Sequence, residues 1–172
     1  MSATAITAGT SRPRPGRVRR ALGLGGFLAA SAAVATLGGL ASANGVDTWY
    51  QGVVKPAWTP PDAVFGPVWT VLYAGMAVGT WRVWDRHGWT GARRALTTYG
   101  GQLALNCAWS PVFFGAHRVG AGLGVILALD VAVFATILAF RRLDPTAAAI
   151  LVPYLAWCLY ATTLNAGILA LN

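Results

Sequence analysis

The side chains with the greatest potential for chemistry are two amides and one carboxylate that lie inside long apolar runs: Asn106, Asn165 and Asp130. An amide in apolar surroundings is costly unless it is hydrogen-bonded, so both Asn side chains should point inward and bond each other, backbone carbonyls or a ligand. A carboxylate in such a run is by default a candidate functional group. No Lys, Arg or His shares these runs with Asp130, which favours a hydrogen-bonded structural role over a proton relay or an ion site.

Aromatic side chains share helical faces with these amides. Phe65, Trp69 and Tyr73 recur at four-residue spacing, which places three rings on one stripe of a helix. Two further faces combine rings with the amides: Asn106, Trp109, Ser110 and Phe113 form one, and Tyr154, Trp157, Ala161 and Asn165 form the other. An aromatic stripe alone is more often packing, but the added amides favour a pocket for a flat, largely apolar molecule with a few polar substituents.

Other kinds of chemistry have no candidate residues. Cys107 and Cys158 lie in apolar runs without a C-x-x-C motif or a paired His spacing, so we expect no metal site and no disulfide framework. His87 and His117 lie beside Arg or Gly in polar connections, where a surface role is expected. The sequence has no phosphate-binding loop, no G-x-S-x-G, no H-E-x-x-H and no paired carboxylates, so hydrolysis and phosphoryl transfer lack candidate groups.

The composition indicates what surrounds these side chains. Of 172 residues, 56% are hydrophobic and only 10% are charged, and the mean hydropathy is +0.55. So few charges cannot cover a water-soluble fold, whereas lipid requires almost none. The sequence therefore predicts an all-α integral membrane bundle, a single domain over 21–172 behind a disordered basic tail at 1–20. Five uncharged segments, each near the ~20 residues that span a bilayer, are its transmembrane helices: 21–43, 63–81, 95–114, 119–140 and 145–171.

The first segment also resembles a secretory signal, because an arginine-rich stretch precedes it and Ala41-Ser42-Ala43 ends it. A signal h-region has about 7–15 residues, and the segment 21–43 is longer. A retained helix is therefore the favoured interpretation. Residues 145–171 begin behind a helix-start signal, with Asp144 as the expected N-cap and Pro145 in the first turn.

The basic residues predict the orientation in the membrane. If the helices alternate, every basic residue except Lys55 and Arg118 falls on one side: Arg12, Arg14, Arg17, Arg19 and Arg20 precede the first helix, Arg82, Arg86, Arg93 and Arg94 flank the second connection, and Arg141 and Arg142 occupy the fourth. The positive-inside rule then puts the N-terminus in the cytoplasm and the C-terminus outside. The net charge of +8 is explained by topology, and nucleic-acid binding is not expected. Trp81, Trp84 and Trp89, beside these arginines, suit an interface belt.

Small residues mark two faces on which helices approach closely. Gly75 and Gly79 lie on the second helix. A longer stripe on the fourth helix, at four-residue spacing, consists of Gly120, Gly124, Ala128, Ala132 and Thr136. Such stripes pack helices within one chain or between two chains, so both intramolecular packing and a homodimer seam remain open.

The first connection, from Trp49 to Pro61, is too rich in aromatic residues and Pro for a solvated linker. Two interpretations remain open. In the first, it folds as a rigid lid across the outer mouth of the bundle. In the second, Trp49 and Trp58 merely anchor it at headgroup depth.

Four motifs in order resemble the tryptophan-rich sensory protein family (TspO/MBR), also called the translocator protein or peripheral-type benzodiazepine receptor family. They are W-Y-x-x-x-x-K-P-x-W-x-P-P at 49–61, F-G-P-V-W-T-V-L-Y at 65–73, A-L-N-x-x-W-S-P-x-F-F-G at 104–115, and P-Y-L-x-W at 153–157 with L-N at 164–165. The resemblance covers the chain from Trp49 to its C-terminus. It implies a five-helix bundle, usually homodimeric, whose pocket is closed by the first loop.

The resemblance also implies the ligand. Members bind porphyrins such as protoporphyrin IX, with no cofactor required, and some bind sterols or benzodiazepine-type drugs. Carried over by motif position, the ligand-binding residues are Trp49, Tyr50, Trp58, Trp69, Tyr73, Asn106, Trp109 and Trp157. This chain departs from the sterol-binding pattern of animal members, because no Lys or Arg follows Tyr154 and Tyr160, which argues against a sterol ligand.

Three functions are consistent with this pattern. The leading hypothesis is a membrane tetrapyrrole-binding sensor or regulator of porphyrin or stress responses. An alternative is light-dependent porphyrin degradation, in which Trp69 and Trp157 match the family's photo-oxidation tryptophans and no residue acts as a general acid or base. A carrier of small hydrophobic molecules is the third, although no internal repeat and no intramembrane ion-coupling charge supports it.

Overall fold

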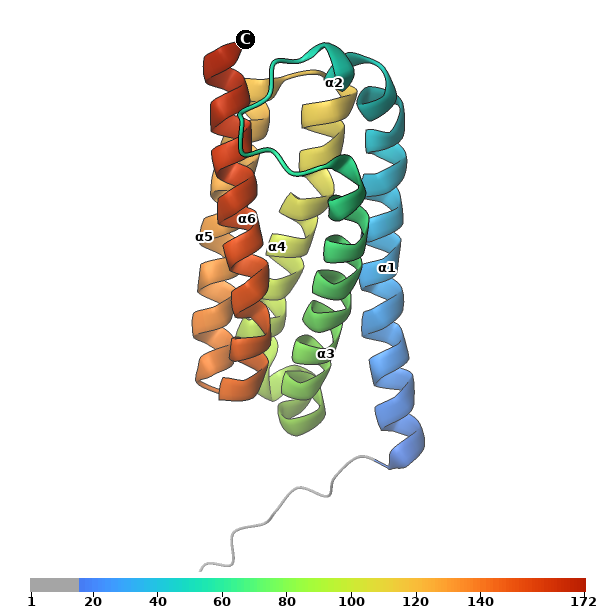
Figure 1. The fold of residues 1–172 in the computed structure, drawn as a ribbon. Helices are drawn as coiled ribbons and strands as arrows, with labels where there is room; N and C mark the ends of the chain where they lie inside the picture. Colours follow the sequence, from blue (N-terminus) through green and yellow to red (C-terminus); the bar gives the residue numbers. More distant parts are fainter. Residues whose placement is uncertain (1–15) are drawn as a thin grey trace, which may run out of the picture.

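The computed structural model describes residues 16–172 as a bundle of long helices (Figure 1). In chain order the elements are α1 (Arg17–Asp47), the short α2 (Trp49–Gly52), the 3-10 turn η1 (Asp62–Val64), α3 (Phe65–Gly91), α4 (Arg93–Ser110), the π-helical segment η2 (Pro111–Gly115), α5 (Val119–Arg141) and α6 (Pro145–Leu171). No strand occurs among these residues, and the predicted all-α membrane bundle is confirmed. Helix α1 begins before the expected position 21, and the predicted tail up to residue 15 lies outside the described residues.

Four of the five long helices are long and apolar enough to cross a membrane: α1, α3 together with η1, α5 and α6. Helix α4 is not apolar enough, because it begins with Arg93 and Arg94 and carries further polar side chains along its length, among them Tyr99, Gln102 and Asn106. All three side chains are buried, and α4 packs against α1, α3 and α5. The polar groups of these three side chains therefore face protein and not lipid, as polar residues in membrane-spanning segments generally do.

Helix α3 extends well past the predicted end at residue 81, as far as Gly91. Arg82 and Arg86 consequently lie on the helix and not beside a loop, and Ala92 alone separates α3 from α4. Gly88 has a φ of 65°, a left-handed conformation that Gly adopts at little cost and that kinks the last turns of α3.

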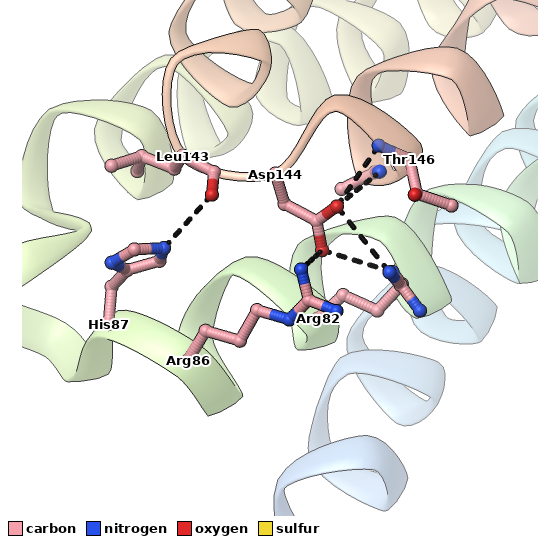
Figure 2. A network of polar contacts seen from close by, with 7 residues as sticks. Arg82, Arg86, His87, Leu143, Asp144 and Thr146 are labelled. Carbon is pink, nitrogen blue, oxygen red and sulfur yellow. Dashed lines mark hydrogen bonds and ion pairs between the residues drawn. The ribbon is translucent and has the colours of Figure 1, made fainter.

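Asp144 joins the start of α6 to this extended end of α3, and Figure 2 shows two arginine side chains that reach its carboxylate from the same side. Its Oδ1 accepts hydrogen bonds from the backbone N–H groups of Thr146 at 3.0 Å and Ala147 at 3.2 Å, which confirms the predicted N-cap. Its Oδ2 lies 3.1 Å from Arg82 Nε and 3.0 Å from Arg86 Nη1. Burial by itself raises the pKa of the Asp144 carboxyl, but the Ala147 N–H and the two guanidinium groups outweigh it and lower that pKa below its usual value.

The indole of Trp84 is buried, with 6% of its surface exposed, so its predicted place in an interface belt is wrong. It packs edge-on against Phe27 and Trp89, with ring centroids 6.1 Å and 6.0 Å away. Gly23 of α1 lies directly against the Trp84 ring, where any β-carbon would clash. The indole therefore fills the contact between α1 and α3, because a glycine on α1 makes room for it. Trp89 remains 61% exposed, as a belt residue would be.

The small-residue stripes differ in what they pack against. Gly79 of α3 lies against α6, where an added β-carbon would come within 2.9 Å of Leu151 Cδ1 and 3.3 Å of the Ala147 carbonyl oxygen. On α5, Gly124 is exposed and faces open space within the chain, and Ala128 is exposed as well. The first stripe thus serves packing inside the bundle, whereas Gly124 and Ala128 of the α5 stripe face outward from the described part of the bundle.

Candidate functional site

A cavity of about 460 Å³ lies inside the bundle, and its lining includes Tyr50 of α2 and Asp62 of η1, which lie on either side of the connection between α2 and α3. Its walls come from α1, α3, α4, η2 and α6, with Leu129 as the contribution of α5. The residues of α1 that line it are small apart from Val46: Ala35, Gly38, Gly39 and Ser42. Small side chains on α1 leave the space that the larger rings of the other helices surround.

The lower wall of the cavity is a chain of hydrogen bonds between neutral side chains. The Tyr73 hydroxyl donates a short hydrogen bond to Asn106 Oδ1, and Asn106 Nδ2 donates to the Tyr154 hydroxyl at 2.9 Å. Tyr154 in turn donates to Gln102 Oε1 at 2.9 Å, and Gln102 Nε2 contacts Met76 Sδ at 3.7 Å. All five side chains are buried. The direction of this chain leaves the Tyr73 oxygen able to accept, and one Asn106 N–H able to donate, toward the cavity that both residues line.

Aromatic rings form the side walls. Trp69 lies 5.5 Å from Tyr73 and 6.2 Å from Tyr154, centroid to centroid. Phe65 of α3 meets Trp157 of α6 edge-to-face at 5.8 Å, which closes the wall between these helices. The Trp157 Nε1–H is buried and has no hydrogen-bond partner among the described residues. It is an unused donor in a residue that lines the cavity.

The π-helical segment η2 sets the upper wall on the α4 side. It follows Ser110 directly and contains Phe113 and Phe114. Trp109 stacks on Phe113 with centroids 4.9 Å apart and an interplanar angle of 17°. The Trp109 Nε1–H donates to Asn165 Oδ1 at 3.3 Å, which ties this stack to α6. A wider π turn often occurs at functional sites, and here it places two successive Phe rings beside the cavity.

The connection between α2 and α3 is tied to the bundle at several points. The Asn172 side chain accepts from the Val54 N–H at 3.1 Å and donates to the Val54 carbonyl at 3.0 Å. The Tyr160 hydroxyl donates to the carbonyl of Trp58 at 2.7 Å. An added β-carbon at Gly167 would lie 2.5 Å from Pro56 Cγ, so only Gly lets the connection approach α6 this closely. These contacts agree with the lid interpretation.

Tyr50 is the lid residue that reaches the cavity. It is 7% exposed, and its ring packs edge-on against Phe113 at 6.4 Å and Phe114 at 5.4 Å. The Lys55 ammonium lies 4.4 Å from the centroid of the same ring. Burial raises the pKa of the Tyr50 hydroxyl, and the negative charge of Asp62 raises it further.

Six of the eight predicted ligand-binding residues line the cavity: Tyr50, Trp69, Tyr73, Asn106, Trp109 and Trp157. The other two lie outside its lining. Trp49 stacks on His117 with ring centroids 4.7 Å apart, and Trp58 is 56% exposed. Asn165 lines the cavity and donates to the Val119 carbonyl at 2.9 Å, and its inward orientation is confirmed.

The remaining candidate side chains are Asp130, Gln102 and the possible metal ligands. Asp130 lies outside the cavity and its Oδ2 accepts a hydrogen bond from Thr162 at 2.7 Å, as the structural interpretation predicts. Gln102 was not predicted, although its place four residues before Asn106 in an apolar run was a usable signal. No group of three or more His, Cys, Asp or Glu that could hold a metal occurs among the residues from 16 onward.

Comparison with known proteins agrees with this architecture. The model of the TspO/MBR family matches residues 27–171. A human translocator protein is 46% identical over 119 residues, which is 68% of this chain and 70% of the relative. A tryptophan-rich sensory protein of Cereibacter sphaeroides is 42% identical over 146 residues, or 85% and 89% of the two chains, and a tryptophan-rich protein TspO of Archaeoglobus fulgidus is 41% identical over 140 residues, or 81% and 90%. This chain is therefore a multi-pass membrane protein that belongs to the TspO/MBR family.

Proposed function

We propose that this protein is a membrane sensor or regulator that binds a tetrapyrrole of the protoporphyrin type in the cavity beneath the lid. The observation that carries the proposal is that six predicted residues, from α2, α3, α4 and α6, line one cavity. Its volume of about 460 Å³ lies within the usual range of small-molecule pockets, about 300–1,000 Å³. A relative named as a sensory protein supports a regulatory output.

The chemistry of the walls supports a flat ligand. Trp69, Trp157 and the Trp109–Phe113 stack present ring faces or edges on which a macrocycle can pack. The polar groups of the lower wall, Tyr73 and Asn106, are few and neutral, which suits a largely apolar molecule with a small number of polar atoms. The proposal requires no resident cofactor and no metal.

The test is a titration of the purified protein in detergent with protoporphyrin IX, read by the Soret band of the porphyrin. Wild-type protein should give a saturable spectral shift. Trp69→Ala should weaken binding by about 1–3 kcal/mol, the usual contribution of stacking on one aromatic ring. The matched control is Trp89→Ala, because Trp89 is exposed and lies outside the cavity. Equal affinity of all three proteins, or no saturable shift in wild type, would refute the site.

Light-dependent breakdown of the bound porphyrin is a second candidate, favoured because both Trp69 and Trp157 line the cavity. An excited macrocycle held there would lie against an indole that can donate an electron, with dioxygen as the final oxidant. The complex should then lose its Soret band under light faster than free porphyrin, and Trp69→Phe/Trp157→Phe should slow the loss. Bleaching at the rate of free porphyrin would reject this activity while leaving binding intact.

We also propose the orientation and the assembly. In Figure 1 the start of α1, the α3–α4 connection and the α5–α6 connection lie at one end of the bundle. Every described arginine except Arg118 lies in or beside these segments, whereas Arg118 and Lys55 lie in the connections at the other end. The positive-inside rule then puts the lid outside the cytoplasm. The exposed Gly124 and Ala128 of α5 support a homodimer seam at that face. Accessibility of a cysteine introduced at position 57 in sealed vesicles tests the orientation.

A further inference from the structure

The charges around the cavity are unusual for a site that takes an acidic ligand. Of the described residues that line it, Asp62 alone carries a charge, and that charge is negative. Protoporphyrin carries two propionate side chains, which are anionic at neutral pH. A carboxylate bound inside such a cavity would lose its hydration and meet no cation in return, which is costly.

Asp62 lies at the mouth of the cavity. It is the first residue of η1, directly after the lid, and its side chain is exposed. Its charge reaches the lid, because it contributes to the raised pKa of the Tyr50 hydroxyl, a group that also lines the cavity. A ligand carboxylate near the mouth would therefore meet repulsion from Asp62 in addition to the apolar walls.

The two basic residues at this end of the bundle both lie outside the cavity lining. Lys55 does not line the cavity, and its ammonium lies 4.4 Å from the centre of the Tyr50 ring. Arg118, the other basic residue at the lid end, is exposed at the start of α5 and also lies outside the lining. The deeper wall offers only neutral donors and acceptors, from Tyr73, Asn106 and the unpartnered Trp157 N–H.

We propose that Asp62 is a specificity-determining residue that disfavours ligand carboxylates, so that the cavity prefers flat molecules whose acidic groups are absent or esterified. This inference rests on the proposed function, since it concerns which member of the tetrapyrrole class the cavity takes. It predicts that protoporphyrin dimethyl ester binds more tightly than the diacid. It also predicts that Asp62 is responsible for part of that difference.

The magnitude follows from the exposure of Asp62. Two unit charges about 4 Å apart in water interact by about 1 kcal/mol, which is about a fivefold change in affinity. Asp62→Asn should therefore tighten the binding of the diacid up to about fivefold and leave the diester unchanged. Asp62 makes no side-chain hydrogen bond or ion pair within the described part of the chain that an amide would lose, so the substitution should not disturb the fold.

The experiment is a four-way comparison of wild type and Asp62→Asn against diacid and diester, with the full chain in one detergent. For each protein, the affinity for the diacid is divided by the affinity for the diester, and the value for Asp62→Asn is then divided by the value for wild type. The different partitioning of the two porphyrins into micelles cancels in this ratio of ratios. Asp47→Asn is the matched control, because Asp47 is exposed at the lid end of α1 and does not line the cavity. The expected result is a gain of up to about fivefold for the diacid in Asp62→Asn alone, and that gain should shrink in high salt.

Two results would overturn the proposal. A ratio of ratios of one, with both porphyrins bound, removes the role of Asp62 and leaves the proposed function standing. A diacid that binds wild type more tightly than the diester, after correction for micelle partitioning, shows that the site recognises carboxylates. If neither porphyrin binds at all, the proposed function is refuted, and this inference with it.

Discussion

Among single substitutions that remove one charged side chain from the described residues, Asp144→Ala should destabilise the bundle most. The carboxylate is fully buried and accepts from two backbone N–H groups at the start of α6 and from two guanidinium groups on α3. It therefore caps one helix and binds that helix to another. Figure 2 shows that Arg82 and Arg86 both approach it from one side.

The expected cost can be worked from these contacts. Loss of an N-cap costs about 1 kcal/mol. Removal of one partner from a fully buried ion pair costs about 3–5 kcal/mol, and a surface pair contributes about 0–1 kcal/mol. The Arg82 and Arg86 side chains are 26% and 52% exposed, so their loss should cost about 2 kcal/mol, between these limits. The total of about 3 kcal/mol lowers the melting temperature by about 6–12 °C in a chain of this size.

The assay is thermal unfolding in detergent, followed by the helical circular dichroism signal. Asp85→Ala is the control, because the one ion pair of Asp85 among the described residues is with Arg20, which is 44% exposed, and its loss should cost less than about 1 kcal/mol. Asp144→Asn should fall between wild type and Asp144→Ala, since the amide oxygen can still cap α6. A melting temperature of Asp144→Ala within about 2 °C of the Asp85→Ala value would refute the reasoning.

The pH dependence provides an independent check. The pKa of Asp144 is lowered in the folded protein, so its stabilisation is present above the unfolded pKa of about 3.9. It is lost as the pH falls through the folded value. Wild type should therefore lose its advantage over Asp144→Asn only below about pH 4. A constant difference between the two proteins down to pH 2 would contradict this assignment.

Two further substitutions test the packing and the polar wall. Gly23→Val should destabilise the protein by about 1–3 kcal/mol, because its β-carbon would collide with the Trp84 ring, whereas Gly25→Val, with open space around it, should not; equal melting temperatures would contradict the role of Trp84. Gln102→Leu should cost about 1–3 kcal/mol, because the Tyr154 hydroxyl loses its acceptor, and should also weaken porphyrin binding although Gln102 does not line the cavity. The control is Gln51→Leu, at an exposed position. Unchanged porphyrin affinity in Gln102→Leu would show that the orientation of Asn106 does not depend on the hydrogen bonds that link it through Tyr154 to Gln102.

Part of the cavity lining could be predicted because a polar side chain in an apolar segment is costly in contact with lipid and therefore faces the interior of the bundle. Asn106 shares a helical face with Trp109, and an amide that must avoid lipid carries the rings of its own face inward with it. Trp69 and Tyr73 share no face with an amide and were indicated by their four-residue spacing and by the motif at 65–73. Neither argument applies to α1, which contributes the small residues Gly38, Gly39 and Ser42 to the lining. Small residues of this kind also occur wherever helices pack closely, so their positions in the sequence do not indicate a cavity.

The length of α3 could not be predicted for a different reason. Hydropathy ends the segment at Arg82, because an isolated guanidinium does not belong in an apolar helix. The helix continues because Asp144, far along the chain, accepts from Arg82 at 3.1 Å. The predicted N-cap role of Asp144 was correct, but a cap has only local partners, whereas this carboxylate also has partners on another helix. A charge that ends a hydropathy segment can therefore lie inside the helix when its partner comes from elsewhere in the chain.

Asp130 and Asn106 show how far the reasoning about buried polar groups reaches. Both are polar side chains in long apolar segments, and the same cost of burial applies to both. Asn106 lies on α4, which faces the cavity, and its second N–H is free to meet a ligand. Asp130 lies on α5 outside the cavity lining, where Thr162 of α6 donates to its Oδ2 and its Oδ1 has no hydrogen-bond partner among the described residues. The cost of burial turns both groups toward the protein, but the neighbouring helices decide whether each one meets a protein partner or the cavity. The sequence pattern does not contain that arrangement of helices.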